Sequence, residues 1–123
     1  MFFEPGAEDP VILFDWQASH WGRGVQDLAY HLTLAYAPER RKEIEGEMLE
    51  RYHEGLLANG VENYSLGEVR EDYEYGLLWA LWVFPLAVGN LDLSAEYGQQ
   101  LLGKFVNNAV VSALELDIDR YLG

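Results

Sequence analysis

The chain has 123 residues, half of them hydrophobic and 14% aromatic, with no cysteine and a formal net charge of −13 at pH 7. This length predicts one domain over residues 1–123 with its own hydrophobic core, and the lack of cysteine excludes disulfide scaffolds and thiolate metal sites. The negative charge repels a phosphate backbone, so a nucleic-acid partner is not expected. The charge either serves solubility alone or favours cationic ligands.

No basic and apolar leader follows Met1, which predicts a cytoplasmic protein. The most apolar stretch runs from Leu77 to Leu91 and is interrupted by Pro85 and Gly89. It is shorter than the ~20 residues that a membrane-spanning helix needs. We therefore expect a buried helix and no membrane partner, and an adhesive apolar patch if part of the surrounding core were missing.

Two short β-favouring pieces open the chain. Phe2 and Phe3 form the first, the run from Val11 to Phe14 forms the second, and the residues between them include proline, glycine and aspartate. Such turn residues between apolar runs are typical of a small hairpin. We predict a β-hairpin within residues 1–15, which places Asp15 at the end of its second strand.

Apolar residues at helical spacing follow, and they predict about four helices over residues 27–122. The first helix should start near Asp27, and the second should run from Pro38 to Ala58 and stop before Gly60. The third should start at the Ser65–Glu68 capping box, and the fourth after Ser94. Pro85 should kink or end the third helix, and Asp117 and Asp119 should weaken the end of the fourth. The predicted fold class is mainly α, with a short amino-terminal β-hairpin followed by four helices.

The core is expected to form from one apolar stripe on each helix. In chain order, these stripes are Leu28, Leu32 and Ala35; Ile44, Met48, Tyr52 and Leu56; Val69, Tyr73, Leu77 and Leu81; and Tyr97, Leu101, Phe105, Ala109 and Ala113, the last widened by Leu102, Val106 and Val110.

Asp15 is the first candidate functional residue. A carboxylate directly after a buried strand is held rigidly at the edge of the core. Mg²⁺ prefers such hard oxygen ligands and is often bound by one or two carboxylates together with substrate phosphates. The position alone is equally typical of an aspartate that caps the turn after a strand.

The order of residues in segment 11–32, VILFDWQASHWGRGVQDLAYHL, adds a resemblance. An Asp-Trp-Gln triplet, a loop with two glycines and an Asp-Leu-Ala-Tyr helix start follow one another. This order resembles a signature of the aminoglycoside phosphotransferase and choline-kinase-like superfamily, and most of all the branch of the ecdysteroid-kinase-like proteins. The resemblance implies that Asp15 is the magnesium-binding aspartate and that Asp27 is structural, anchoring the catalytic loop.

The resemblance also shows what this sequence does not contain. Complete relatives carry His-Gly-Asp-x-x-x-x-Asn, with the presumed catalytic base, just before this segment, and an amino-terminal lobe that holds ATP. Phosphoryl transfer requires all of these parts together. We therefore expect a partial carboxy-terminal lobe with no catalytic residue of its own, binding neither ATP nor Mg²⁺ and inactive alone. The alternative is a stand-alone acidic helical binding or interaction module.

The remaining candidates concern ligands and partners. His20, Glu71 and Asp72 are candidates for binding a small-molecule substrate, although a solvated loop histidine and acids that suit a helix amino terminus are the simpler explanations. Trp79 and Trp82 line either a pocket or the core. Exposed apolar surface on an incomplete lobe predicts self-association, most simply as a symmetric homo-oligomer.

Overall fold

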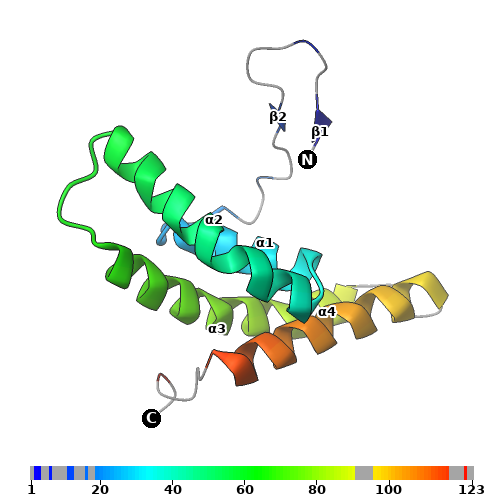
Figure 1. The fold of residues 1–123 in the computed structure, drawn as a ribbon. Coiled ribbons are helices and arrows are strands. Elements are labelled where there is room, and N and C mark those ends of the chain that lie inside the picture. The colour runs from blue at the N-terminus through cyan, green and yellow to red at the C-terminus, as the bar shows by residue number, and fades with distance from the viewer. Residues whose placement is uncertain are drawn as a thin grey trace.

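The computed structural model describes residues 2–3, 6, 11–12, 16, 19–90, 96–116 and 121, without the side chains of residues 2–3, 11–12 and 83–90. Its elements, in chain order, are β1 (Phe2–Phe3), β2 (Val11–Ile12), α1 (Val25–Ala35), α2 (Pro38–Ala58), α3 (Leu66–Asn90) and α4 (Glu96–Glu115) (Figure 1). The mainly α-helical class with four helices in the described part is confirmed. β1 and β2 pair antiparallel, with Phe2 opposite Ile12. Most of the connection between them, and Asp15, lie outside the described residues.

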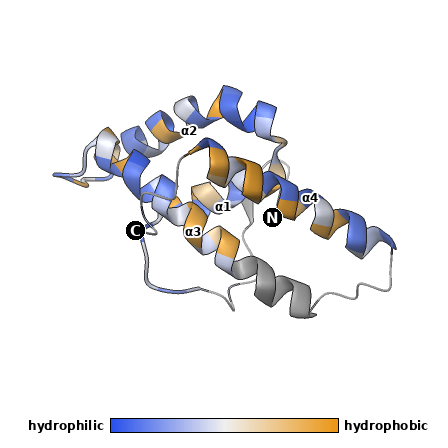
Figure 2. Cartoon of the chain, turned by 90° about the horizontal axis from the view of Figure 1, so that it is seen from below, coloured by the Kyte–Doolittle hydropathy of each residue, from blue (hydrophilic) through white to orange (hydrophobic). Residues whose placement is uncertain are grey.

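Each of the four helices contacts the other three, so α1 packs against α2, α3 and α4. Its closest neighbour is α3, where a Cβ atom built on Gly76 would lie 3.1 Å from the Cβ of Ala29 and 3.2 Å from the Cα of Gln26. Glycine therefore lets the two backbones approach. Hydrophilic residues make up most of α2, whereas hydrophobic residues are frequent in α1 and in the described part of α3 (Figure 2). The buried core cluster comprises Val25, Ala29, Leu32, Leu49, Val69, Tyr73, Leu77 and Ala113.

The predicted stripes hold best on α3 and fail in part elsewhere. Val69, Tyr73 and Leu77 are buried, as predicted. On α1, Leu32 is buried and Leu28 is partly buried, as predicted, but Ala35 is exposed, and Val25 and Ala29 complete the buried face. On α4, Ala109 and Ala113 are buried, as predicted. The prediction that three further residues widen this buried stripe is wrong, because Val106 and Val110 are exposed and Leu102 is only half-buried.

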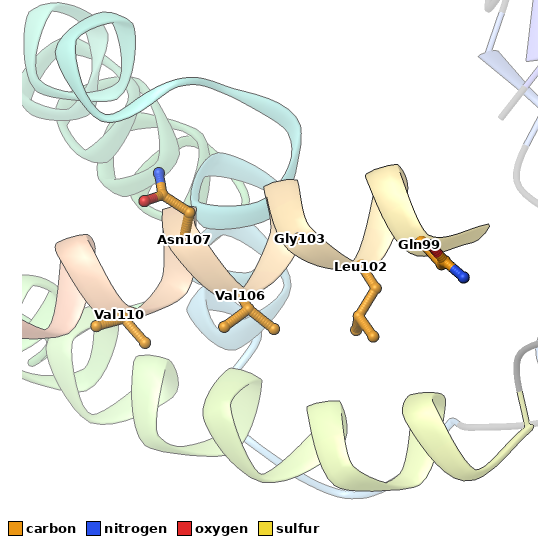
Figure 3. Close-up of a pocket in the computed structure, with 6 residues that line it drawn as sticks. All are labelled: Gln99, Leu102, Gly103, Val106, Asn107 and Val110. Atoms are coloured by element: carbon orange, nitrogen blue, oxygen red, sulfur yellow. The ribbon is translucent and has the colours of Figure 1, made fainter. Parts of the chain in front are cut away.

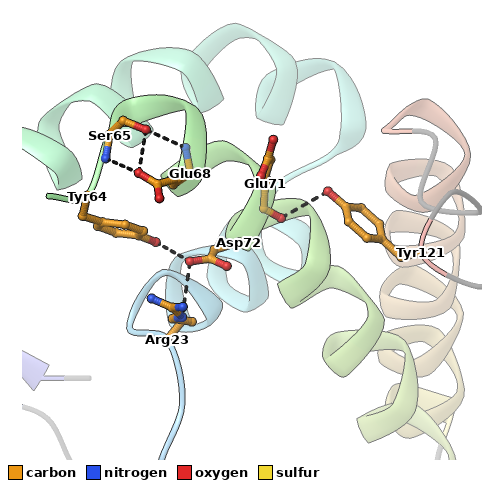
Figure 4. Close-up of polar contacts among 7 residues, drawn as sticks. All are labelled: Arg23, Tyr64, Ser65, Glu68, Glu71, Asp72 and Tyr121. Carbon is orange, nitrogen blue, oxygen red and sulfur yellow. Dashed lines mark hydrogen bonds and ion pairs between the residues drawn. The ribbon is translucent and has the colours of Figure 1, made fainter.

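Both ends of α2 and the start of α3 lie where the proline, glycine and capping-box residues of the sequence predicted them. Helix α2 has the predicted bounds, and Gly60 follows with a φ of 84°. The Gly60 N–H donates to the Leu57 carbonyl and the Val61 N–H to the Leu56 carbonyl, which is the hydrogen-bonding pattern of a Schellman cap. The capping box before α3 is confirmed by hydrogen bonds between Ser65 and Glu68 in both directions (Figure 4).

Helix α3 does not end at Pro85 but continues to Asn90. A proline removes one main-chain hydrogen bond, and a helix continues beyond it when its other contacts offset that loss. Ser94, Asp117 and Asp119 lie outside the described residues. Within the described part of the chain, no helix combines the length and hydropathy needed to cross a bilayer.

A buried arginine joins three helices, and no sequence pattern predicted it. Arg41 on α2 is 1% exposed and pairs with Glu45 of its own helix and with Glu115 of α4 at 2.5 Å. The Tyr73 hydroxyl of α3 donates to the same Glu45 carboxylate at 2.8 Å. Burial disfavours the charged guanidinium and is the largest single effect, but the interactions with Glu45 and Tyr73 together outweigh it, so the pKa of Arg41 is raised. We call these four residues the Arg41 network.

The Arg41 network and the α3 cap predict loss of stability in acid. Hydrogen bonds from Lys42 and Arg41 lower the pKa of Glu115, and those from Ser65 lower the pKa of Glu68. A lowered folded-state pKa means that the stabilisation is present above the ordinary value of 4.5 and disappears as the pH falls through the folded-state pKa. The urea midpoint should therefore be flat from pH 7 to about 5 and fall below that, and Glu115→Gln should flatten the fall. A midpoint that rises in acid would contradict this assignment.

Candidate functional site

The predicted magnesium ligand, Asp15, lies outside the described residues, but the chain that follows it is described in part. Trp16 is largely exposed, and its carbonyl accepts a hydrogen bond of 3.0 Å from the Ser19 N–H. This hydrogen bond brings Trp16 and Ser19 close together, and the segment 19–24 leads from Ser19 into α1. Among the described residues, no group of three His, Asp or Glu side chains is arranged to hold a metal ion.

Asp27, the predicted anchor of a catalytic loop, lies in the first turn of α1 and is exposed. Negative charge at a helix amino terminus is favourable. The Tyr52 hydroxyl of α2 lies beside this turn, so close that a Cβ atom built on Gly24 would be 2.7 Å from it. Burial and the carboxylates of Asp27 and Asp72 raise the pKa of Tyr52. Tyr52 is therefore a neutral phenol at physiological pH, next to the start of α1.

Asp72 on α3 is the most connected of the predicted substrate ligands. Its carboxylate accepts a hydrogen bond of 2.7 Å from the Tyr64 hydroxyl and lies 3.5 Å from the Arg23 Nε (Figure 4). The Arg23 guanidinium is also 5.8 Å from the centre of the Tyr64 ring, within cation–π range. Burial and the bond to Asp72 raise the pKa of Tyr64 well above its ordinary value, so Tyr64 remains a donor.

His20, the second predicted substrate ligand, also contacts α3. Its ring stacks on the Trp79 indole, with centroids 5.1 Å apart and an interplanar angle of 26°. Tyr30 of α1 meets the same indole edge-on, with centroids 5.7 Å apart. Trp79 is half-buried, whereas Trp82, one turn further along, is exposed. Trp79 therefore serves packing, and Trp82 belongs neither to the core nor to the described pocket.

Glu71, the third predicted substrate ligand, points away from the other two. In Figure 4 its carboxylate is directed away from Arg23 and Tyr64. Its main-chain carbonyl accepts a hydrogen bond of 3.4 Å from the Tyr121 hydroxyl, which also donates to Glu74 at 3.2 Å. The structure thus places His20 within the loop 19–24, Asp72 against this loop, and Glu71 near the carboxy-terminal segment.

The sequence did not indicate that Arg23, Tyr52 and Tyr64, which come from three different parts of the chain, contribute to the surface near the start of α1. Arg23 lies between the two glycines of the loop, so its position in the motif was a usable signal. Tyr52 was assigned only to the apolar stripe of α2, because periodicity shows which face is buried and not where a hydroxyl ends. Tyr64 lies just before the capping box, a position that carries no signal of its own.

A separate open hollow of about 670 Å³ lies along α4, lined by Gln99, Leu102, Gly103, Val106, Asn107 and Val110. None of these side chains is charged, and Figure 3 shows Leu102 and Val106 on the side of α4 opposite Asn107. Because the lining contains none of the candidate residues on the loop or α3, this hollow is not part of the surface around Asp27 and Asp72.

Comparison with known proteins identifies one family. The sequence model of the ecdysteroid kinase-like (EcKL) family matches residues 1–62, about half of the chain. This range includes Asp15, the loop and all of α1. No curated protein and no solved structure matches the chain significantly. The expected kinship with kinase-like phosphotransferases is confirmed at the level of the family: the chain belongs to the ecdysteroid kinase-like family.

Proposed function

We propose that this chain forms the metal-binding part of a kinase-like small-molecule phosphotransferase, with the fold of its carboxy-terminal lobe. In this proposal Asp15 is a ligand of Mg²⁺, and Asp27 anchors the loop that carries the catalytic base. The reaction transfers a phosphoryl group from ATP to a hydroxyl of a small molecule. The observation that carries the proposal is the family match, because it spans both aspartates in one continuous segment.

The surroundings of Asp27 support its role. Its carboxylate is exposed at the start of α1, and within the described residues no group donates a hydrogen bond to it. It is thus free to accept N–H groups of a loop that lies over the start of α1. The Tyr52 hydroxyl lies beside the same helix start, 2.7 Å from where a Cβ atom on Gly24 would be. Asp27 is a positioning residue in this scheme, since it acts through the loop that it holds.

The chemistry of the donor set fits Mg²⁺. The ion is commonly held by one or two protein carboxylates and by nucleotide phosphates, and it neutralises charge on the phosphoryl group during transfer. One carboxylate provides a weak site without nucleotide. This chain alone is therefore expected to retain neither Mg²⁺ nor ATP, and a metal–nucleotide complex in excess should contact Asp15 only weakly and transiently.

The metal role can be tested with Mn²⁺, a paramagnetic substitute for Mg²⁺. In ¹⁵N-labelled chain with excess ADP, Mn²⁺ should broaden the amide resonances of Trp16 and Ser19 first, and Mg²⁺ should reverse the effect. Asp15→Asn should weaken this binding at least tenfold. Glu62→Gln, which removes one exposed carboxylate from the α2–α3 connection, is the control and should change nothing. Broadening spread evenly over the acidic surface and insensitive to Asp15→Asn would disprove the assignment.

The isolated chain is expected to transfer no phosphate, because its sequence contains no His-Gly-Asp-x-x-x-x-Asn motif. The measurement is transfer from radiolabelled ATP to a panel of small alcohols, aminoglycosides and choline. Product formation that Asp15→Ala abolishes would refute the expected inactivity while supporting the metal role.

We propose as a second candidate a helical interaction module that self-associates through α4. Exposed or half-buried apolar residues recur at every fourth position of this helix, at Leu102, Val106, Val110 and Leu114. Two copies of this uncharged stripe would cover one another in a symmetric pair. The net charge of −13 on each chain opposes the association, so it should strengthen as salt screens the repulsion.

The mass in solution tests this candidate. Sedimentation in 0.15–0.5 M salt, where the screening length falls from about 8 Å toward 3 Å, should show a dimer whose affinity rises with salt. Val106→Lys should produce monomers. Gln100→Lys adds the same charge on the same helix outside the stripe and should leave the dimer intact. Monomers of the unaltered chain at every salt concentration would exclude the candidate.

A further inference from the structure

The carboxy-terminal end of α2 holds an asparagine followed by a glycine. Asn59 is the cap residue of α2, Gly60 follows it, and both are exposed. Asparagine is among the thermally least stable residues, because its side-chain amide is open to attack by the main-chain nitrogen of the next residue. A glycine hinders that attack least, since it carries no Cβ atom. Asn59 is the one asparagine of the sequence that a glycine follows.

The reaction that this pair can undergo is a ring closure followed by hydrolysis. The Gly60 nitrogen forms a bond to the side-chain carbonyl carbon of Asn59 and gives up its proton to water, and the side-chain nitrogen leaves as ammonia. Water then opens the resulting succinimide at either of its two carbonyl carbons, which yields aspartate or isoaspartate. One water is consumed and one ammonia is released, so the reaction needs no further reactant.

The cap of α2 holds both reacting groups out of position. The Gly60 N–H donates to the Leu57 carbonyl at 3.1 Å, and the Asn59 Nδ2 donates to the Gly55 carbonyl at 2.8 Å. The ψ of Asn59 is 17°, which turns the Gly60 nitrogen toward the main-chain nitrogen of Asn59 and away from its side chain. Ring closure requires the Gly60 nitrogen on the side of the Asn59 Cβ. The last turn of α2 must therefore open before the ring can close.

Opening of this turn uncovers little buried surface, because residues 57–63 are all exposed. Helix ends of this kind open at a small fraction of the free energy of global unfolding. The product does not restore the cap, since a carboxylate has no N–H to donate to the Gly55 carbonyl. It also adds negative charge at the carboxy terminus of a helix whose last turn has no basic residue. Each conversion should thus leave the end of α2 less ordered.

We propose that Asn59 is a deamidation site that the Schellman cap of α2 keeps closed, so that it converts to aspartate and isoaspartate only when the last turn of α2 opens. This inference is independent of the proposed function. The damage should stay local, because the His53 Nε2 holds the Tyr64 carbonyl at 2.8 Å and so ties the α2–α3 connection to α2 ahead of the cap.

The test measures the rate of deamidation in the whole chain at mildly alkaline pH, folded and unfolded in guanidinium chloride. Peptide mapping by mass spectrometry locates the converted residue, and an isoaspartate-specific carboxyl methyltransferase counts the isoaspartate. Conversion at Asn59 should be about tenfold or more faster in the unfolded chain. Asn63 is exposed in the same connection but precedes Tyr64, and it should remain an amide in both states.

Two variants of Val61 test the cap itself, because the Val61 N–H donates to the Leu56 carbonyl at 3.0 Å. Val61→Pro removes this donor and should raise the ratio of folded to unfolded rates by about three- to tenfold, the worth of one hydrogen bond. Val61→Thr keeps the donor and should leave the ratio unchanged. Taking the ratio cancels any effect of the substitution on the chemistry of the open chain.

Every other result overturns part of the proposal. Equal rates in the folded and unfolded chain would refute protection, and conversion at Asn63 ahead of Asn59 would refute the site. An unchanged ratio in Val61→Pro would refute the role of the cap. If that variant does not fold, guanidinium chloride below the unfolding midpoint replaces it: the rate in the unaltered chain should rise before the global transition, and a rise only with that transition would refute local opening.

Discussion

Glu45→Ala is expected to lower the free energy of unfolding by about 3–5 kcal/mol, the typical cost of removing one partner from a buried ion pair. Arg41 is 1% exposed and, of its two carboxylate partners, would keep Glu115 alone. The Tyr73 hydroxyl, in a residue that is also 1% exposed, would lose its acceptor. Both losses leave polar groups inside the protein without water to replace the missing partner.

The control for this prediction is Glu43→Ala on the same helix. Glu43 pairs with Arg40 at 2.8 Å, but both side chains are exposed, so the loss should be about 1 kcal/mol or less. Urea unfolding at pH 7 measures both variants. Equal losses in the two variants would mean that the Arg41 network contributes no more than a surface pair. Combining Arg41→Met with Glu45→Leu should recover much of the loss, because an apolar pair leaves no buried charge.

Gly76→Leu is expected to destabilise the chain by about 3 kcal/mol, through overpacking where α1 and α3 meet. The Cβ position is already 3.1 Å from the Ala29 Cβ, and one of the other near atoms is the Cα of Gln26, which cannot rotate away. Leucine can therefore fit only if α1 moves. Since α1 contacts every other helix, that movement would disturb the whole core and the start of α1 beside Asp27.

Gly46→Leu is the matched control and should have the opposite sign. Gly46 lies within α2, and a Cβ atom there would meet nothing within 4 Å. Replacing glycine by a strong helix former in such a place should stabilise the chain by about 0.5–1 kcal/mol. The two urea midpoints should therefore move in opposite directions. A Gly76→Leu chain as stable as the original would show that α1 and α3 tolerate separation at this point.

The sequence was most informative where the signal is local. Pro38 at a first helical turn and Gly60 after the last one give both limits of α2, since a proline and a left-handed glycine act within one turn. The Ser65–Glu68 box identifies the start of α3 for the same reason. The order of Asp15, the glycine loop and Asp27 was enough to indicate the family.

What the sequence could not determine were the partners of each polar side chain. Asp72 and Glu71 are neighbours with the same chemistry, yet the Asp72 carboxylate contacts Arg23 and Tyr64, whereas Glu71 contacts Tyr121 through its main-chain carbonyl. Arg41 appeared to be one more charge on a surface helix, until the fold brought Glu115, 74 residues away, within 2.5 Å of it. Helical periodicity reports which side of a helix is apolar. Whether a charge on that helix is buried, paired or free depends on how distant helices pack, because burial and ion pairing are set by the distance in space between groups far apart in the chain.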